Sequence, residues 1–153
     1  MHSKLRYSVF YWLPVLLWMV VIFGASSDRH SFSHSSRLIG PIVRWLIPHI
    51  SDHALYRVIF GIRKIAHLME YAILALLIWR ALRQPVSNNT RPWQWRRATF
   101  ALLLVVLYAA SDEFHQAFVP SREASVIDVL IDTSGAAVGL GVLWMAGRRC
   151  GRW

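Results

Sequence analysis

Residues 98–118, ATFALLLVVLYAASDEFHQAF, decide the fold of this chain. The first part, 98–110, carries no charge, whereas the last part adds Asp112, Glu113 and His115 directly after it. As a helix, the uncharged residues 98–111 cover only ~21 Å, which is less than the ~30 Å hydrocarbon core of a bilayer. If this segment crosses a membrane, its ionisable groups therefore lie at membrane depth.

The composition of the whole chain indicates a membrane protein. The 153 residues are 56% hydrophobic and include eight Trp, which is more apolar surface than a soluble domain of this size can easily bury. Lys and Arg outnumber the acids by 17 to 8, a balance also typical of nucleic-acid-binding proteins. The basic residues cluster at the ends of apolar runs instead of forming one stripe, so we do not expect nucleic acid as a partner. The single cysteine, Cys150, excludes an internal disulfide and a cysteine metal cluster.

We expect one all-α integral membrane domain, 1–153, built as a four-transmembrane-helix bundle. Four apolar stretches have the length needed to cross the bilayer as helices. The first lacks a small-residue cleavage site after a short apolar region, which favours a retained helix over a signal peptide. The expected spans are about 7–25, 58–82, 97–118 and 125–147.

The distribution of positive charge predicts the orientation of these spans. Ten Lys and Arg lie in the N-terminal segment, the 80–97 connection and the C-terminal tail. Because positive loops stay in the cytoplasm, both termini are expected there. The long loop 26–57 and the connection 119–124 would then face outward. Within the long loop, the apolar residues of SSRLIGPIVRWLIP fit either a helix lying in the outer interface or an apolar loop, since Gly40-Pro41 weakens a helix.

Three of the expected helices bring polar groups to one depth. Counted at ~1.5 Å per residue from the basic ends of the helices, His67 lies at ~20 Å, Asp112 at ~22 Å and Asp132 at ~24 Å. Charged groups at this depth should face the bundle interior, so we expect His67 near Asp112 or Asp132. The polar layer consists of Lys64, His67, Glu70, Tyr71, Asp112, Glu113, His115, Gln116, Asp128 and Asp132.

Two glycines continue the aspartate stripe of the fourth span. Gly135 and Gly139 form a small-xxx-small pair, which lets a second helix approach closely. The partner would be another helix of the chain or, in a homodimer, a second copy.

Two patterns in these residues resemble the VanZ-like family of bacterial membrane proteins. The first is K-x-x-H-x-x-x-Y, read here at Lys64, His67 and Tyr71. The second is S-D-E-x-H-Q-x-F-V-P-x-R-x-A-S-x-x-D-V-x-x-D/N-x-x-G, which runs from Ser111 to Gly135. The resemblance covers nearly all of the chain. Because the family is named for a protein linked to low-level teicoplanin resistance, it implies the bacterial inner membrane and a role at the cell envelope.

Two classes of function fit this picture. In the first, the protein binds or processes a lipid-linked envelope substrate or a glycopeptide-type antibiotic near the outer leaflet. Asp112, His115 and Glu113 would supply acid/base groups, and Lys64 and Arg122 would hold an anionic headgroup. The other expected substrate-binding residues are His67, Tyr71, Gln116, Asp128 and Asp132. In the second class, the protein is a small proton- or ion-coupled transporter or flippase.

Two further hypotheses concern the polar layer itself. A divalent metal could be held by His67, His115, Asp112 and Asp128, whose nitrogen and oxygen ligands suit several ions. Alternatively, the layer is a structural network of buried ion pairs, in which Asp128 completes a capping box begun by Ser125. The sequence contains no nucleophile elbow, P-loop or zincin helix, which weakens the case for an enzyme without deciding the question.

Overall fold

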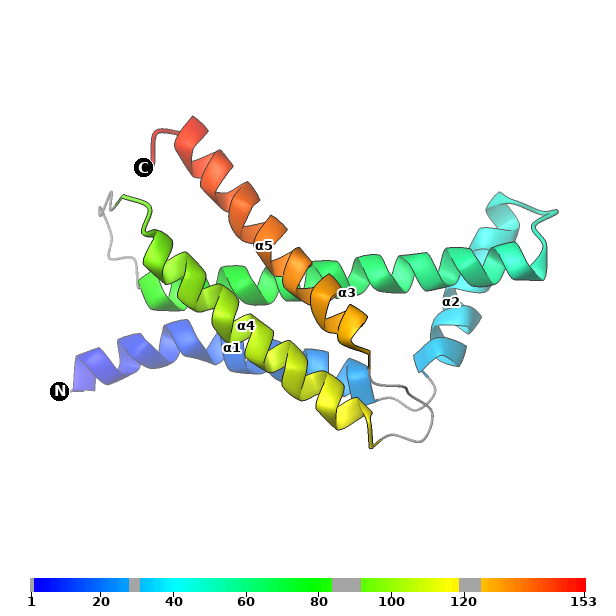
Figure 1. The fold of residues 1–153 in the computed structure, drawn as a ribbon, viewed down its shortest axis with the longest axis horizontal. Coiled ribbons are helices and arrows are strands. Elements are labelled where there is room, and N and C mark those ends of the chain that lie inside the picture. The colour runs from blue at the N-terminus through cyan, green and yellow to red at the C-terminus, as the bar shows by residue number, and fades with distance from the viewer. Residues whose placement is uncertain (1, 28–30, 84–91, 119–124) are drawn as a thin grey trace.

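The computed structural model describes residues 2–27, 31–83, 92–118 and 125–153, and this part of the chain is all-α (Figure 1). It contains five helices and no strand. Their bounds are α1 His2–Ser27, α2 Ser31–Leu46, α3 Asp52–Arg83, α4 Trp95–Gln116 and α5 Val126–Arg149.

Among the described residues, three helices are long and apolar enough to cross a membrane: α3, α4 and α5. They correspond to the expected second, third and fourth spans. The expected first span lies within α1, whose apolar stretch Val9–Ala25 is shorter. The largest difference from expectation is the start of α3, which begins at Asp52 instead of about residue 58.

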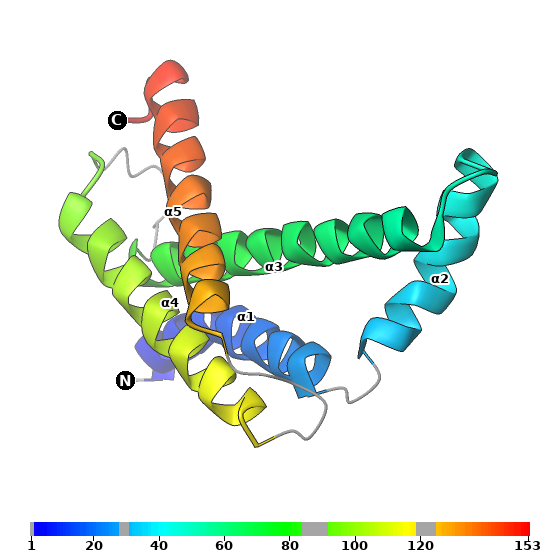
Figure 2. The same cartoon turned by 45° about the vertical axis from the view of Figure 1, so that its right-hand side comes forward.

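Helix α3 organises the bundle. It contacts each of the other four helices and packs most extensively against α5. With 32 residues, α3 is ~48 Å long and exceeds the ~30 Å hydrocarbon thickness. Its first turns therefore extend beyond the ends of α1, α4 and α5, and α2 lies against this extension (Figure 2). Both termini lie at the opposite end of the molecule (Figure 1).

The core is built from small and branched side chains on the facing surfaces of the helices. Tyr71 and Leu74 of α3 are fully buried between Val105 of α4 and Ala136 of α5 in one apolar cluster, to which Ile22 of α1 also belongs. Large apolar side chains on the outer surfaces stay exposed, as expected of helices whose outer surfaces meet lipid.

The segment that was predicted as either an interfacial helix or a loop is helical. Helix α2 continues through Gly40 and Pro41, and the Arg44 guanidinium donates a hydrogen bond of 2.6 Å to Asp52 at the start of α3. Leu38 and Trp45 of α2 point away from the protein and are largely exposed. The helix thus presents an uncovered apolar surface next to the projecting end of α3.

Tryptophan and arginine side chains pack against one another at the end of the molecule that carries the termini. Trp79 of α3, Trp93 and the C-terminal Trp153 lie within 5.1–5.8 Å of one another, centroid to centroid. The Arg83 guanidinium stacks over two of these rings, at 4.9 Å from Trp153 and 5.0 Å from Trp79. Trp153 also fills the space above Gly147, because a Cβ there would come within 1.8 Å of the indole.

Candidate functional site

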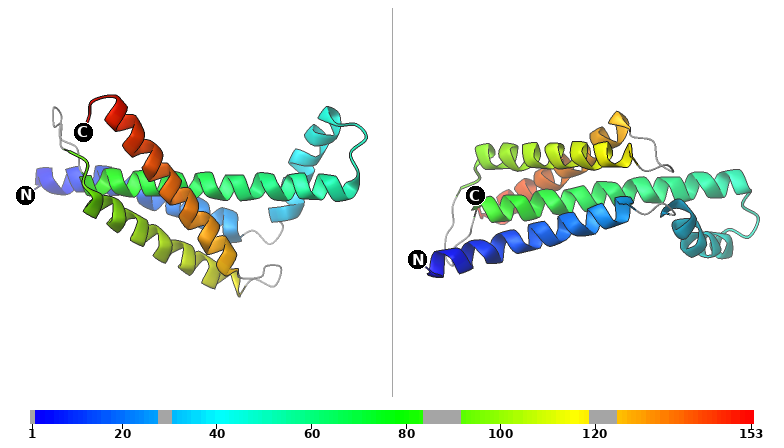
Figure 3. Two further views of the ribbon diagram at one scale, coloured as in Figure 1. Left: turned by 45° about the horizontal axis from the view of Figure 1, so that its top comes forward. Right: turned by 90° about the horizontal axis from the view of Figure 1, so that it is seen from below.

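The site depends on a close approach of α3 and α5, which cross in the bundle (Figure 3). A Cβ at Gly135 would lie 2.3 Å from the Leu68 carbonyl oxygen, and a Cβ at Gly139 would lie 3.0 Å from the Ala72 Cβ. Only glycine fits at Gly135, since the obstructing atoms belong to the α3 backbone. The glycine pair is therefore occupied by α3 of the same chain, and the homodimer predicted through this surface has no room there.

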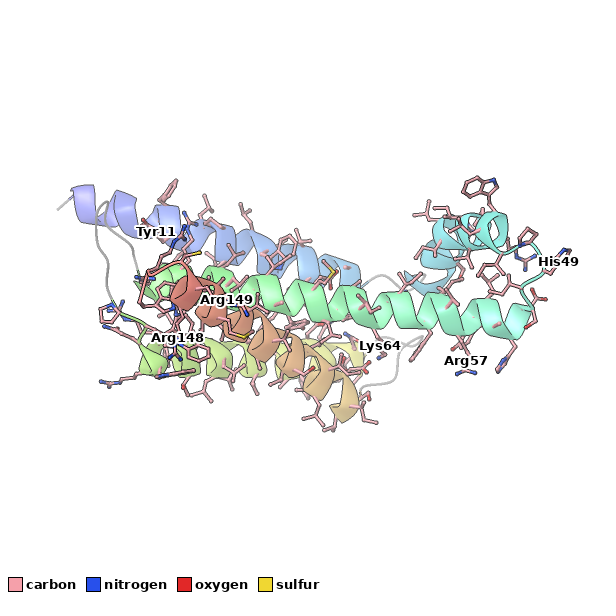
Figure 4. The ribbon with its side chains drawn as sticks, turned by 90° about the horizontal axis from the view of Figure 1, so that it is seen from above. Tyr11, His49, Arg57, Lys64, Arg148 and Arg149 are labelled. Atoms are coloured by element: carbon pink, nitrogen blue, oxygen red, sulfur yellow. The ribbon has the colours of Figure 1, made fainter. Side chains whose placement is uncertain are left out.

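Polar side chains of α3 and α5 meet one to two turns away from these glycines. The Lys64 ammonium donates a hydrogen bond to Asp128 Oδ1, near the first turns of α5 (Figure 4). The His67 Nδ1 atom lies 3.7 Å from Asp132 Oδ1 and 4.0 Å from Glu70 Oε2. The prediction that His67 lies near an acid of the third or fourth span is confirmed.

The role of Asp128 differs from the capping interpretation. Ser125 is the N-cap residue of α5 and makes no side-chain cap hydrogen bond within the described residues. The Ser125 backbone N–H instead donates to Glu113 Oε2 of α4 at 2.8 Å. Glu113 therefore supplies, from another helix, the acceptor that a capping box would take from Asp128. This contact gives Glu113 a structural task, and its predicted acid/base role stays a prediction.

A second group of polar residues connects α3 and α4. The Gln116 amide donates to Asp112 Oδ2 at 3.1 Å, and the Tyr71 hydroxyl donates to the same oxygen at 3.5 Å. Tyr71, Asp112 and Gln116 are all buried. These residues come from the two motifs that the sequence places at one depth, and the structure brings them into contact.

His115 faces a different neighbour. Its ring packs against Phe23 of α1, with ring centroids 4.5 Å apart, whereas the described hydrogen bonds of Asp112 run to α3 and to its own helix. The His115 Nδ1 atom is buried and accepts or donates no hydrogen bond within the described ranges. A shared catalytic role of Asp112 and His115 therefore stays a prediction.

Sequence reasoning did not single out the residues that tie α1 to the site. The Trp18 indole N–H donates to the Glu70 carbonyl at 2.9 Å, and the Tyr108 hydroxyl donates to the Met19 carbonyl at 2.6 Å. The available signal was an aromatic side chain with a polar tip in an otherwise apolar span, because such a tip needs a partner when buried.

Asp132 is the least compensated carboxylate at the site. Its side chain is almost completely buried, with 2% of the residue exposed. Asp132 Oδ1 has no hydrogen-bond partner in the described part of the chain, since His67 at 3.7 Å is too far for one.

The described residues do not form a metal centre. No group of three or more His, Cys, Asp or Glu side chains within them could hold a metal ion. His67 and His115, two of the candidate ligands, contact different helices. The geometry therefore gives the metal hypothesis no support. Arg122, predicted to hold a headgroup, lies outside the described residues.

Comparison with known proteins identifies the family. No curated protein and no solved structure matches the chain. The sequence model described as VanZ/LLP1 matches residues 10–147, which includes both motifs and all the residues of the polar layer. Together with its three apolar helices, this match indicates a membrane protein, and the chain belongs to the VanZ/LLP1 family.

Proposed function

We propose that this protein is a four-span inner-membrane protein of the bacterial cell envelope whose polar layer binds a cationic amine. The ligand would be an envelope amphiphile, such as a lipid-linked precursor or a glycopeptide-type antibiotic, that presents the amine near the outer leaflet. Reduced susceptibility to such an antibiotic would be one cellular consequence.

The observation that carries this proposal is the buried Asp132, whose Oδ1 accepts no hydrogen bond from the described residues. A buried carboxylate without a partner is costly, because it has lost its water shell and gains no hydrogen bond in return. Ionisable residues inside a membrane usually have a functional role, in which they face a cavity or contact a ligand. An ammonium group at Asp132 Oδ1 would supply both the missing hydrogen bond and the missing positive charge.

The charge of the whole layer favours a cation over an anion. In the described part of the chain, the layer holds five carboxyl groups, and its fixed positive charge is that of Lys64, next to which Arg63 stands in the sequence. The Lys64 ammonium is already paired with Asp128, and its predicted role of holding a phosphate stays a prediction. An incoming anion would meet net repulsion, whereas an incoming amine would reduce it.

The outer edge of the polar layer is accessible. Lys64 and Asp128 are partly exposed, with 24% and 31% of their side chains accessible, whereas Asp132 lies one turn deeper and is buried. A ligand amine can therefore meet Asp128 first and reach Asp132 next. The projecting turns of α3 and the apolar surface of α2 lie beyond this accessible edge. The hydrophobic part of an amphiphile would bind there.

The experiment compares single-chain amphiphiles that differ only in the headgroup. Binding of dodecylamine, dodecyl phosphate and dodecyl maltoside to the purified protein in phosphatidylcholine nanodiscs is measured by calorimetry. We expect dodecylamine to bind best and Asp132→Asn to weaken it about 10- to 100-fold, because a hydrogen bond to a charged group contributes about 1.5–3 kcal/mol. The control is Asp52→Asn, which removes an exposed carboxylate outside the layer and should leave the preference for dodecylamine over dodecyl maltoside unchanged, even where the lost contact to Arg44 changes the binding of every amphiphile.

Two outcomes would contradict the amine site. Tighter binding of dodecyl phosphate than of dodecylamine would show that the layer prefers anions. Equal binding of dodecylamine to the wild type and to Asp132→Asn would show that Asp132 is not the acceptor. A structural network would then be the better description, since Lys64–Asp128 and Glu113–Ser125 both join helices.

Proton coupling is a second candidate, supported by the buried hydrogen bonds among Tyr71, Asp112 and Gln116. Buried chains of such groups are typical of proton relays in transporters. The test uses proteoliposomes that contain a pH-sensitive dye. Acidification of the lumen that requires both the amphiphile and Asp112, and that Asp112→Asn abolishes, would favour transport over binding alone.

The proposed topology places both termini in the cytoplasm, in agreement with their position at one end of the bundle (Figure 1). A Cys150→Ser background with single cysteines at Ser33 or Ser87 is labelled with a membrane-impermeant maleimide on intact cells. Ser33 should react and Ser87 should not. The reverse pattern would invert the topology.

A further inference from the structure

A cavity of about 730 Å³ lies at the end of the molecule that carries both termini. It is formed where the last turn of α3 meets the first turns of α4, and its lining includes Leu82, Arg96, Arg97, Phe100 and Leu103. Its size is within the range of sites that enclose small ligands. It is far along α3 from the polar layer and is independent of the function proposed above.

The lining changes from charged to apolar along α4. Arg96 and Arg97 stand in the first turn, and Phe100 and Leu103 follow ~5 Å and ~10 Å deeper along the helix. Phe100 and Leu103 are about half exposed, at 50% and 54%. Because the surrounding surface of α4 is that of a membrane-crossing helix, these side chains face hydrocarbon. The cavity therefore has a cationic rim followed by an apolar wall. This is the same order as the charged headgroup and the acyl chains of a phospholipid.

The described residues do not neutralise the positive charge at the rim. Neither Arg96 nor Arg97 forms an ion pair within the described residues, and no acid is among the lining residues there. The Arg97 guanidinium donates one hydrogen bond, of 3.3 Å, to the Arg83 carbonyl. This contact orients Arg97, and its planar guanidinium retains further N–H donors, which can bind two oxygens of an oxyanion such as a phosphate.

The tryptophans at this end support a headgroup depth for the cavity. Trp95, which precedes Arg96, is 63% exposed and packs against Trp93 and Trp144. Exposed tryptophans of membrane proteins gather at the level of the lipid headgroups. The arginines next to Trp95 are therefore at the height of the lipid phosphates.

We infer that this cavity is a binding site for one anionic glycerophospholipid. Arg96 and Arg97 bind its phosphate, and an acyl chain lies along Phe100 and Leu103. Basic cavities between membrane helices bind anionic headgroups in this way. The occupant is a membrane lipid and not free phosphate, because three of the seven lining residues, Leu82, Phe100 and Leu103, are apolar and would gain nothing from an inorganic ion.

The test measures lipid retention by the detergent-purified protein. Dioleoyl-phosphatidylglycerol and dioleoyl-phosphatidylcholine, which have the same chains, are added separately, and bound lipid is counted by native mass spectrometry. We expect one phosphatidylglycerol to be retained in preference to phosphatidylcholine. Arg96→Gln with Arg97→Gln should weaken its retention about thirtyfold, which corresponds to about 1 kcal/mol for each arginine.

A control pair removes the same charge elsewhere at this end. Arg149→Gln with Arg152→Gln eliminates two exposed positive charges outside the cavity, and retention should fall less than threefold. The single variant Arg96→Gln, which leaves the Arg97–Arg83 hydrogen bond in place, keeps the test valid if the double variant fails to fold, and should weaken retention about fivefold.

Three results would overturn the inference. The first is equal retention of the two lipids by the wild type, which indicates only non-specific annular lipid. The second is an equal loss in the cavity pair and the control pair, which indicates general electrostatic attraction. The third is displacement of phosphatidylglycerol by excess inorganic phosphate, which indicates an ion site without a lipid.

Discussion

Replacement of Gly135 by alanine tests the contact on which the whole site depends. The added Cβ would lie 2.3 Å from the Leu68 carbonyl oxygen and 2.8 Å from the Leu68 Cα. A normal carbon–oxygen contact is ~3.3 Å or more, so α3 and α5 must separate by about 1 Å. Both obstructing atoms are backbone atoms inside a helix, and no rotamer change can relieve the clash. We therefore expect a loss of about 1–3 kcal/mol in the free energy of unfolding.

Gly141→Ala is the matched control for this prediction. Gly141 lies on the same helix, and an added Cβ there meets no atom within 4 Å among the described residues. The change should leave stability unaltered or raise it by up to about 1 kcal/mol, because alanine favours a helix interior more than glycine does. Thermal unfolding of both variants in the same detergent gives the comparison. If Gly135→Ala unfolds at the same temperature as Gly141→Ala, the close approach of α3 and α5 is refuted.

Three further predictions concern the polar contacts. Lys64→Met and Asp128→Asn should each destabilise the protein by about 1–3 kcal/mol, and the double variant by less than their sum, because each single change leaves one charge without its partner; a thermal double-variant cycle measures the coupling. Tyr71→Phe should cost about 1–2 kcal/mol in unfolding free energy through the lost hydrogen bond to a carboxylate, and an unchanged unfolding temperature would show that this contact does not form. Glu113→Ala should cost about 0.5–2 kcal/mol as a lost helix cap, while Glu113→Gln should retain most of the stability because its amide oxygen still accepts the hydrogen bond; equal losses in the two variants would argue against the capping role.

The helices and the depth of the polar layer were accessible from the sequence. The span 98–118 and its counterparts are recognisable because a helix needs a minimum apolar length to cross a bilayer. The common depth of His67 and Asp132 follows from the constant rise of a helix, and their proximity in the structure agrees with it. The projecting end of α3 was not predicted, because Asp52–Arg57 is polar enough to resemble a loop.

The partners of each polar residue were decided only by the tertiary structure. Helical periodicity places Asp128 and Asp132 on one stripe, but it does not determine which side chain of another helix each of them meets. That choice depends on the crossing of α3 and α5, and the glycine contact at Leu68 sets how closely they cross. As a result, Lys64 binds Asp128, and the cap of α5 comes from α4. The sequence alone determined that ionisable residues lie within or next to long apolar helical stretches; packing determined that Asp132 Oδ1 is left without a hydrogen bond among the described residues, because rigid helices at a fixed separation bring donors to some acids and not to others.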